Sequence, residues 1–99
     1  MGDSAKTMKT VKIKLVDAAE RAALHPDTFE VPSNKELSKL IVGDLIKVCE
    51  GGERFWCKII QIKDDKIIGS VDSYLIFSKL KYNDLIEIKH QNIYAIYEG

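Results

Sequence analysis

Residues 50–62, EGGERFWCKIIQI, decide the fold because a glycine turn signal stands directly before a run of strand-forming residues. Aromatic and β-branched side chains such as those of Phe55, Trp56 and Ile59 fit a pleated, half-buried surface. Gly51 and Gly52 tolerate the positive φ angles of a tight two-residue turn. We therefore predict a hairpin, with residues 45–50 as its first strand and residues 53–62 as its second.

The two-residue turn also predicts the register of this hairpin. Three cross-strand pairs follow from it: Glu50 with Glu53, Val48 with Phe55, and Ile46 with Cys57. A slip of one residue would place Lys47 opposite Cys57 and send a lysine into the core, which a buried face does not tolerate. Trp56 then lies beside Lys47 on the opposite face. After Ile59 the apolar positions shift, which indicates a bulge.

The composition is that of one small globular domain with no overall field. The chain has 99 residues, of which 45% are hydrophobic and 30% charged, and its 15 basic and 15 acidic residues give a net charge of zero. Zero net charge attracts neither nucleic acid nor an anionic membrane, although local clusters stay possible. Only Arg21 and Arg54 are arginines, which disfavours the bidentate recognition of phosphates and bases. No apolar run is long enough to span a bilayer, and no hydrophobic signal core is present. We expect a cytoplasmic protein without a membrane partner.

The segment before the hairpin predicts helices and an extended strap. We expect residues 1–10 to be a flexible N-terminus and residues 11–99 a single domain, in which residues 40–99 form the β portion. Residues 11–15 are either an edge strand or the approach to a helix that Asp17 and Glu20 begin with a capping box. One apolar face of this helix comprises Leu15, Ala19, Ala22 and Ala23. Residues 25–33 should be an extended strap anchored by Phe29 and Val31. Ser33 and Glu36 predict a second, short helix ending near Leu40.

Two similar segments, residues 40–48 and 80–88, each read Leu-x-x-(Gly/Asn)-Asp-Leu-Ile-x-(Val/Ile). Gly43 and Asn83 are the residue types that best adopt the left-handed conformation, so each segment predicts a turn that launches a strand. Between them, a turn at 63–66 should place Ile60 opposite Gly69 in a strand at 67–72.

The apolar run Tyr74–Phe77 is expected to close one end of a barrel. Residues 85–89 and 93–97 are the last two strands. The fold class is mainly β (α+β), a small five-stranded antiparallel SH3-like barrel with an N-terminal helix.

The segments GDLIKV, GERFWCKIIQI, DDKIIGSVDS and LKYNDLIEIKHQNIYAI resemble a family of small bacterial proteins of unknown function. Its members share a Gly-Asp-x-(Ile/Val) strand, a Glu-x-(Phe/Trp)-Trp strand and a closing Gly-Asp segment. Asn83 stands where the family has glycine. The resemblance covers about residues 42–97, and it implies a compact β-rich domain without assigned catalytic residues.

The candidates for catalysis and metal binding are few. Cys57 and His90 could form a nucleophile and base, but the register points Cys57 into the core, where thiols are inert. The cysteines and histidines lack the spacing of a zinc site, so we expect neither a metal nor another cofactor. Cys49 and Cys57 lie on opposite faces, three pairs out of register, which predicts two free thiols.

Trp56, Lys47, Arg54 and Lys58 are the candidate binding residues. An aromatic ring among cationic groups on one barrel face can hold a peptide or a single strand. The alternative is that the N-terminal helix covers Trp56, and this alternative is favoured because large aromatic side chains are highly buried on average. The function that we expect is a noncatalytic domain that binds a protein or peptide through a barrel face or sheet edge. The alternatives are a nucleic-acid-binding accessory domain and, third, a small enzyme.

Overall fold

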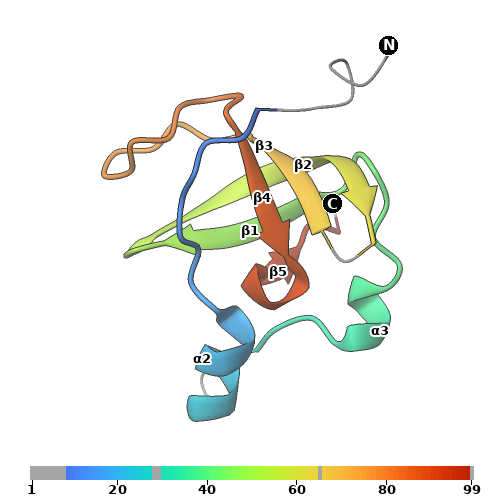
Figure 1. Cartoon of the computed structure of the whole chain (residues 1–99). Coiled ribbons are helices and arrows are strands. Elements are labelled where there is room, and N and C mark those ends of the chain that lie inside the picture. The colour runs from blue at the N-terminus through green and yellow to red at the C-terminus, as the bar shows by residue number, and fades with distance from the viewer. Residues whose placement is uncertain (1–8, 28–29, 65, 99) are drawn as a thin grey trace.

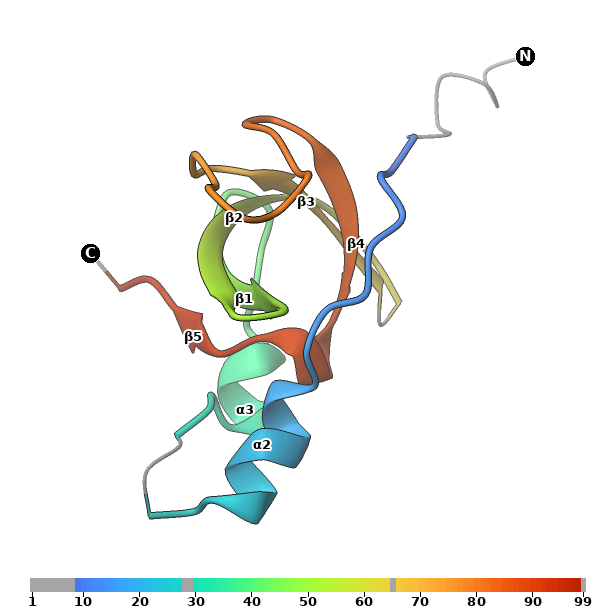
Figure 2. The same ribbon diagram turned by 90° about the vertical axis from the view of Figure 1, so that its left-hand side faces the viewer.

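The computed structural model describes residues 9–27, 30–64 and 66–98, and its chain is mainly β (Figure 1). Five strands form one antiparallel sheet in the order β4-β3-β2-β1-β5. The elements in chain order are α2 (Ala18–Leu24), α3 (Asn34–Leu37), β1 (Leu45–Glu50), β2 (Glu53–Lys63), β3 (Lys66–Val71), β4 (Leu85–Lys89), the 3₁₀ turn η1 (His90–Asn92) and β5 (Ala95–Ile96). The sheet curls around one core, but no pairing of β4 with β5 closes it among the described residues. Figure 2 shows this curl from the side.

The β1–β2 hairpin has the predicted register. Val48 pairs with Phe55 and Ile46 with Cys57, and all four side chains are buried. Their face joins isoleucines of β3 and β4 in the main core, while Lys47 and Trp56 pair on the outer face. The pattern alone was sufficient here because the turn length and the polarity of Lys47 exclude the shifted pairing.

A bulge interrupts β2, as the shift of apolar positions predicted. Pairing with β3 moves by one residue between Ile59 and Gln61. The predicted partner of Gly69 is therefore wrong: Gly69 faces Ile59, not Ile60. The extra residue in a bulge has no cross-strand partner, so every pair on one side of it is displaced by one position.

The two repeated segments make the same turn. Gly43 and Asn83 have φ angles of 103° and 73°, which confirms their predicted left-handed conformation. In each copy the following aspartate accepts a backbone N–H from three residues earlier, over 3.0 Å for Asp44 and 2.8 Å for Asp84. The turns launch β1 and β4, so one local solution positions two strands of the sheet.

Residues 11–16, here named the crossing segment, cover the open side of the sheet. Val11 donates its backbone N–H to the Leu85 carbonyl over 2.7 Å, and Val16 donates to the Cys49 carbonyl over 2.8 Å. Its alternating apolar side chains, Val11, Ile13 and Leu15, pack against the main core. The segment is extended without being a strand of the sheet, and it leads into α2 (Figure 1).

Helix α2 lies beside η1 rather than over Trp56. Asp17 caps it by accepting the Glu20 N–H over 2.8 Å, and Gln91 of η1 donates to the same carboxylate over 3.1 Å. The predicted apolar face is wrong for Ala19 and Ala23, which are exposed, whereas Leu15 packs against the main core. The buried alanine of the helix is Ala18. Ala18 packs with Cys49 and Tyr94 in a second small core.

The segment between the helices contributes one predicted anchor. Val31 packs against the second small core, whereas Phe29 lies outside the described residues, as does most of the predicted flexible N-terminus. Ser33 and Glu36 form the predicted reciprocal capping box of α3. No helix in the described part of the chain is both long and apolar enough to cross a bilayer.

Candidate functional site

Trp56 lies half-buried on the outer face of the β1–β2 hairpin and has two ring contacts. Lys47, directly opposite on β1, places its Nζ 4.9 Å from the centroid of the indole ring. Tyr97, which follows β5, meets the indole edge-on, with 5.8 Å between centroids and an interplanar angle of 82°. These contacts fix the plane of the indole ring while leaving part of it accessible. The expectation that α2 covers Trp56 is wrong, because that helix packs at η1.

Arg54 and Lys58 flank Trp56 on the same face of β2, and both are exposed. The Arg54 Cζ lies 4.9 Å from the centroid of the Tyr94 ring. Lys58 faces Leu45 on β1 and Ser70 on β3. The structure thus brings the four predicted residues onto one face, where Tyr97 joins them. We name these five residues the outer-face cluster: Lys47, Arg54, Trp56, Lys58 and Tyr97.

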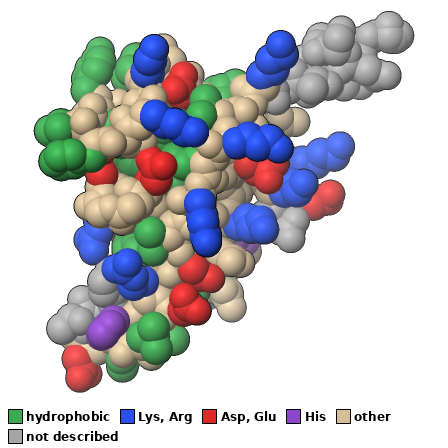
Figure 3. Space-filling model, turned by 60° about the vertical axis from the view of Figure 1, so that its left-hand side comes forward, with side chains coloured by type: hydrophobic (Ala, Val, Ile, Leu, Met, Phe, Trp, Pro, Cys, Tyr) green, Lys and Arg blue, Asp and Glu red, His purple; other side chains and the backbone are tan. Residues whose placement is uncertain are grey.

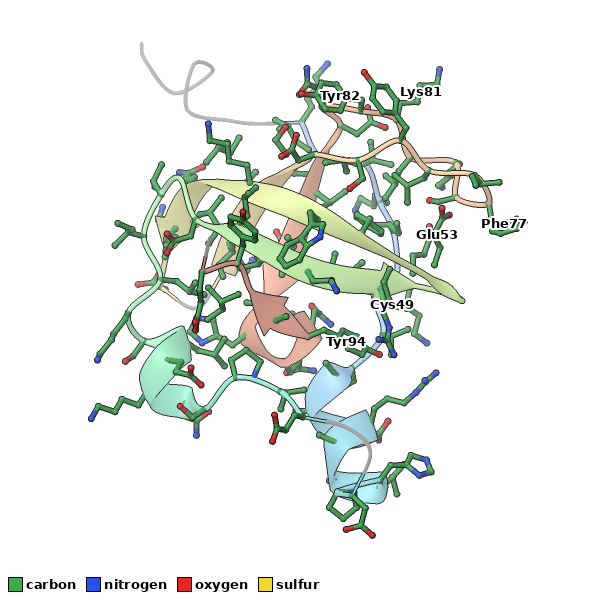
Figure 4. The ribbon with its side chains drawn as sticks, turned by 180° about the vertical axis from the view of Figure 1, so that it is seen from behind. Cys49, Glu53, Phe77, Lys81, Tyr82 and Tyr94 are labelled. Atoms are coloured by element: carbon green, nitrogen blue, oxygen red, sulfur yellow. The ribbon has the colours of Figure 1, made fainter. Side chains whose placement is uncertain are left out.

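The tyrosines of this region were missed from the sequence. Tyr97 reaches Trp56 only because β5 returns to pair with Ile46 and Lys47 of β1. Tyr94 packs beside Cys49, as Figure 4 shows, and burial raises the pKa of its hydroxyl group. The alternation of residues 93–97 predicts a strand, but no local signal says which strand it pairs with.

The geometry disfavours nucleophilic chemistry at Cys57. Its side chain is fully buried between Ile46 of β1 and Val71 of β3. Burial, with a smaller effect of the Asp72 charge, raises the pKa of the Cys57 thiol to about 12. A thiol needs to ionise to attack, so this environment keeps it unreactive. Cys49 is also a free buried thiol, and its Sγ donates to the Gly51 carbonyl over 3.3 Å.

The described part of the chain contains no cluster of metal-binding side chains. No group of three or more His, Cys, Asp or Glu side chains there could hold an ion.

The β3–β4 loop, residues 72–84, forms a second surface next to the hairpin tip. The Glu53 carboxylate accepts the backbone N–H groups of Ile76, Phe77 and Ser78 over 2.8, 2.9 and 3.0 Å. These hydrogen bonds lower the pKa of Glu53, and the bond from Ile76 has the largest effect. The Ser78 hydroxyl also donates to Glu50. Two glutamates of the hairpin therefore hold the end of this loop in place, and Figure 4 shows Glu53 close to the part that bears Phe77.

The expectation that residues 74–77 close a barrel end is wrong for three of the four. Leu75 packs against the core, but Tyr74, Ile76 and Phe77 are 85%, 81% and 88% exposed. A strand-like apolar run suggests burial of every large side chain, whereas the carboxylate of Glu53 fixes the backbone of residues 76–78 with Ile76 and Phe77 both facing out.

A groove of about 410 Å³ lies between the crossing segment and the edge of β4. Lys12 and Lys14 line one side, and Glu87 and Lys89 line the other. The crossing segment thus occupies part of the β4 edge, while the opposite edge strand, β5, has only two residues. Neither edge offers a long free row of backbone groups for an added strand.

Comparisons with protein families, curated proteins and solved structures gave no match for this chain. The resemblance to a family of small bacterial proteins therefore stays a prediction.

Proposed function

We propose that this chain is a noncatalytic binding domain that holds a protein or peptide through the outer-face cluster. The observation that carries the proposal is the accessible Trp56, oriented by Lys47 and Tyr97 and flanked by exposed Arg54 and Lys58. Tryptophan, tyrosine and arginine are the residues that most often dominate binding energy at interfaces. An oriented ring also loses less side-chain freedom when a partner covers it.

The proposal extends to the fold, for which we favour an SH3-like barrel that is open on one side. Two features support it. The last strand returns to pair with the first, and a 3₁₀ turn precedes that last strand. The crossing segment takes the place of strand pairing on the open side. Small barrels of this kind serve many functions, so the function is argued from the cluster and not from the fold.

A peptide selection tests the proposal directly. Peptides selected from a displayed library against the folded protein should contain an acidic residue beside an apolar one, because Lys47, Arg54 and Lys58 are all cationic. Calorimetric titration of a synthetic peptide should then show at least about tenfold weaker binding for Trp56→Ala, since truncating a central aromatic costs about 2 kcal/mol or more. Lys63→Ala, an exposed lysine at the far end of β2, is the matched control and should bind like wild type.

A second variant keeps the result interpretable if Trp56→Ala unfolds. Lys47→Ala combined with Lys58→Ala removes only side chains at the surface of the sheet and should also weaken binding. Peptides that bind both variants as well as they bind wild type would refute the proposal. Tight, salt-sensitive binding of a single-stranded oligonucleotide would favour the nucleic-acid function instead, because released counterions drive phosphate binding.

A further inference from the structure

The β3–β4 loop concentrates exposed apolar side chains, with two lysines beside them, at one projecting corner of the molecule. The loop contains Lys79 and Lys81, and it begins with Asp72 and ends with Asp84. The carboxylates of Asp84, Glu50 and Glu53 accept hydrogen bonds from the loop itself. Its exposed large side chains are Tyr74, Ile76, Phe77 and Tyr82. Figure 1 shows the loop extending away from the sheet, and Figure 3 shows hydrophobic side chains at this corner with both basic and acidic side chains around them. The corner is convex.

The loop is ordered before any partner binds. Its base is fixed where Ser73 accepts the Trp56 N–H over 3.1 Å, and its tip is fixed by Glu53. The Tyr74 and Tyr82 rings stack with 5.1 Å between their centroids, which joins the two sides of the loop. Leu80 is buried and acts as an anchor in the core. Ordering a flexible loop opposes binding, and this loop has already lost that freedom in the free protein.

We propose that the β3–β4 loop docks this protein on the surface of an anionic lipid bilayer. Ile76 and Phe77 enter the boundary between headgroups and acyl chains, Tyr74 and Tyr82 lie at headgroup level, and Lys79 and Lys81 contact anionic headgroups. Aromatic rings with one polar end favour that interface, and lysines near it are attracted by the negative surface potential. Lysine stems can lie along apolar surface while the ammonium groups stay in water.

The shape of the loop favours a bilayer over a protein partner. A convex apolar tip needs a concave apolar pocket in a protein, whereas the bilayer interface accepts it without one. The expectation of no membrane partner came from a net charge of zero and from the absence of a spanning segment. Neither observation detects apolar and cationic side chains gathered in one short loop, because the net charge sums over the chain and a spanning segment is much longer than this loop.

Flotation with lipid vesicles tests this inference. We expect the full chain to float with vesicles of phosphatidylcholine and phosphatidylserine, and to bind vesicles of phosphatidylcholine alone at least about fivefold more weakly. Ile76→Ser combined with Phe77→Ser should weaken binding at least about tenfold, since both apolar side chains are lost from the interface. Ile41→Ser combined with Val42→Ser is the matched control. These side chains are 64% and 58% exposed in the turn before β1, and their removal should leave vesicle binding unchanged.

The charge contribution has its own variants. Lys79→Gln combined with Lys81→Gln should remove most of the preference for phosphatidylserine, whereas Lys63→Gln combined with Lys66→Gln, at the β2–β3 turn, should not. All these positions are exposed, and unchanged melting temperatures would show that each variant folds. The proposal would be overturned if the wild-type protein floated with neither kind of vesicle. It would also be overturned by equal losses in the tip and control variants.

A further outcome concerns a second copy of the chain. Light scattering should give the same molar mass for wild type and for the Ile76→Ser, Phe77→Ser variant. A wild-type dimer that this variant converts to a monomer would assign the loop to self-association and refute membrane docking.

Discussion

One methyl group added at Gly69 should reveal how closely the inner face of the sheet packs. A β carbon at this position would lie 2.8 Å from Ile88 Cδ1 and 3.1 Å from Cys57 Cβ. Carbon atoms in favourable contact are about 3.5–4.0 Å apart. Ile88 and Cys57 are both fully buried, so neither can move without disturbing its neighbours in the core. The lack of space, and not the backbone angle, favours glycine at position 69, since the φ angle of Gly69 is not positive.

The expected cost follows from two opposing effects. Replacing a mid-strand glycine by alanine usually stabilises by about 0.5–1 kcal/mol. Overpacking a well-packed core costs about 1–3 kcal/mol. We therefore expect Gly69→Ala to lower the free energy of unfolding by about 1–2 kcal/mol and the Tm by about 4–16 °C. Gly52→Ala is the control, because its added β carbon would have no heavy atom within 4 Å.

Urea unfolding of a mutant cycle identifies the contact responsible. Ile88→Val deletes the Cδ1 atom that the new methyl group would meet, and alone it should cost about 1 kcal/mol. The double variant should lose at least about 0.5 kcal/mol less than the sum of the single losses. Strict additivity would refute the Ile88 contact as the cause, and a Gly69→Ala protein as stable as wild type would refute close packing at this strand.

Three further predictions concern titration and turn geometry. Because the folded pKa of Cys57 is about 12 against an ordinary 9.0, unfolding releases a proton at alkaline pH. Cys57 should therefore lower stability between these values by up to about 1.4 kcal/mol per pH unit. In urea unfolding at each pH, Cys57→Ala should lose stability less steeply than wild type, and the raised pKa of Tyr94 accounts for part of the slope that is left. The pKa of Glu53 is lowered from 4.5, so its bonds to the loop are present above that value and are lost as pH falls through the folded pKa. The NMR amide shifts of residues 76–78 should report one common titration below pH 4.5, and Glu53→Gln should abolish it. Asn83→Ala should destabilise the protein by about 1–2 kcal/mol in thermal unfolding, because the φ angle of 73° is strained for alanine. Asn83→Gly should not destabilise it, and equal effects of the two variants would contradict this explanation.

Local patterns predicted the parts of the fold that depend on neighbouring residues. The glycine turn and the placement of Lys47 were sufficient for the hairpin register. Gly43 and Asn83 marked two turns correctly because their conformational preference is intrinsic. The bulge was detected in β2, yet its exact position was not, and so the partner of Gly69 was displaced by one residue.

The parts that sequence reasoning missed depend on contacts between distant segments. No local pattern tells that Glu53 accepts three backbone N–H groups from residues more than twenty positions later. Without that constraint, the apolar residues of the β3–β4 loop are expected to be buried. Similarly, α2 was placed over Trp56 because its alanines lacked a partner, whereas Asp17 and Ala18 attach it beside η1. Hydrophobicity predicted that both segments pack against the predicted barrel, but contacts with distant residues hold them elsewhere.

Strand β2 connects the two proposed binding surfaces. Glu53 holds the tip of the β3–β4 loop, and three residues later the Trp56 side chain lies at the centre of the outer-face cluster. The Trp56 backbone is itself bonded to the base of the loop, through its N–H to Ser73 and through its carbonyl to the Asp72 N–H. A partner on the outer face and a bilayer at the loop would therefore be held in a fixed relation by one continuous strand. Because hydrogen bonds join the two surfaces directly, a partner bound at Trp56 would be positioned close to the membrane without any flexible linker.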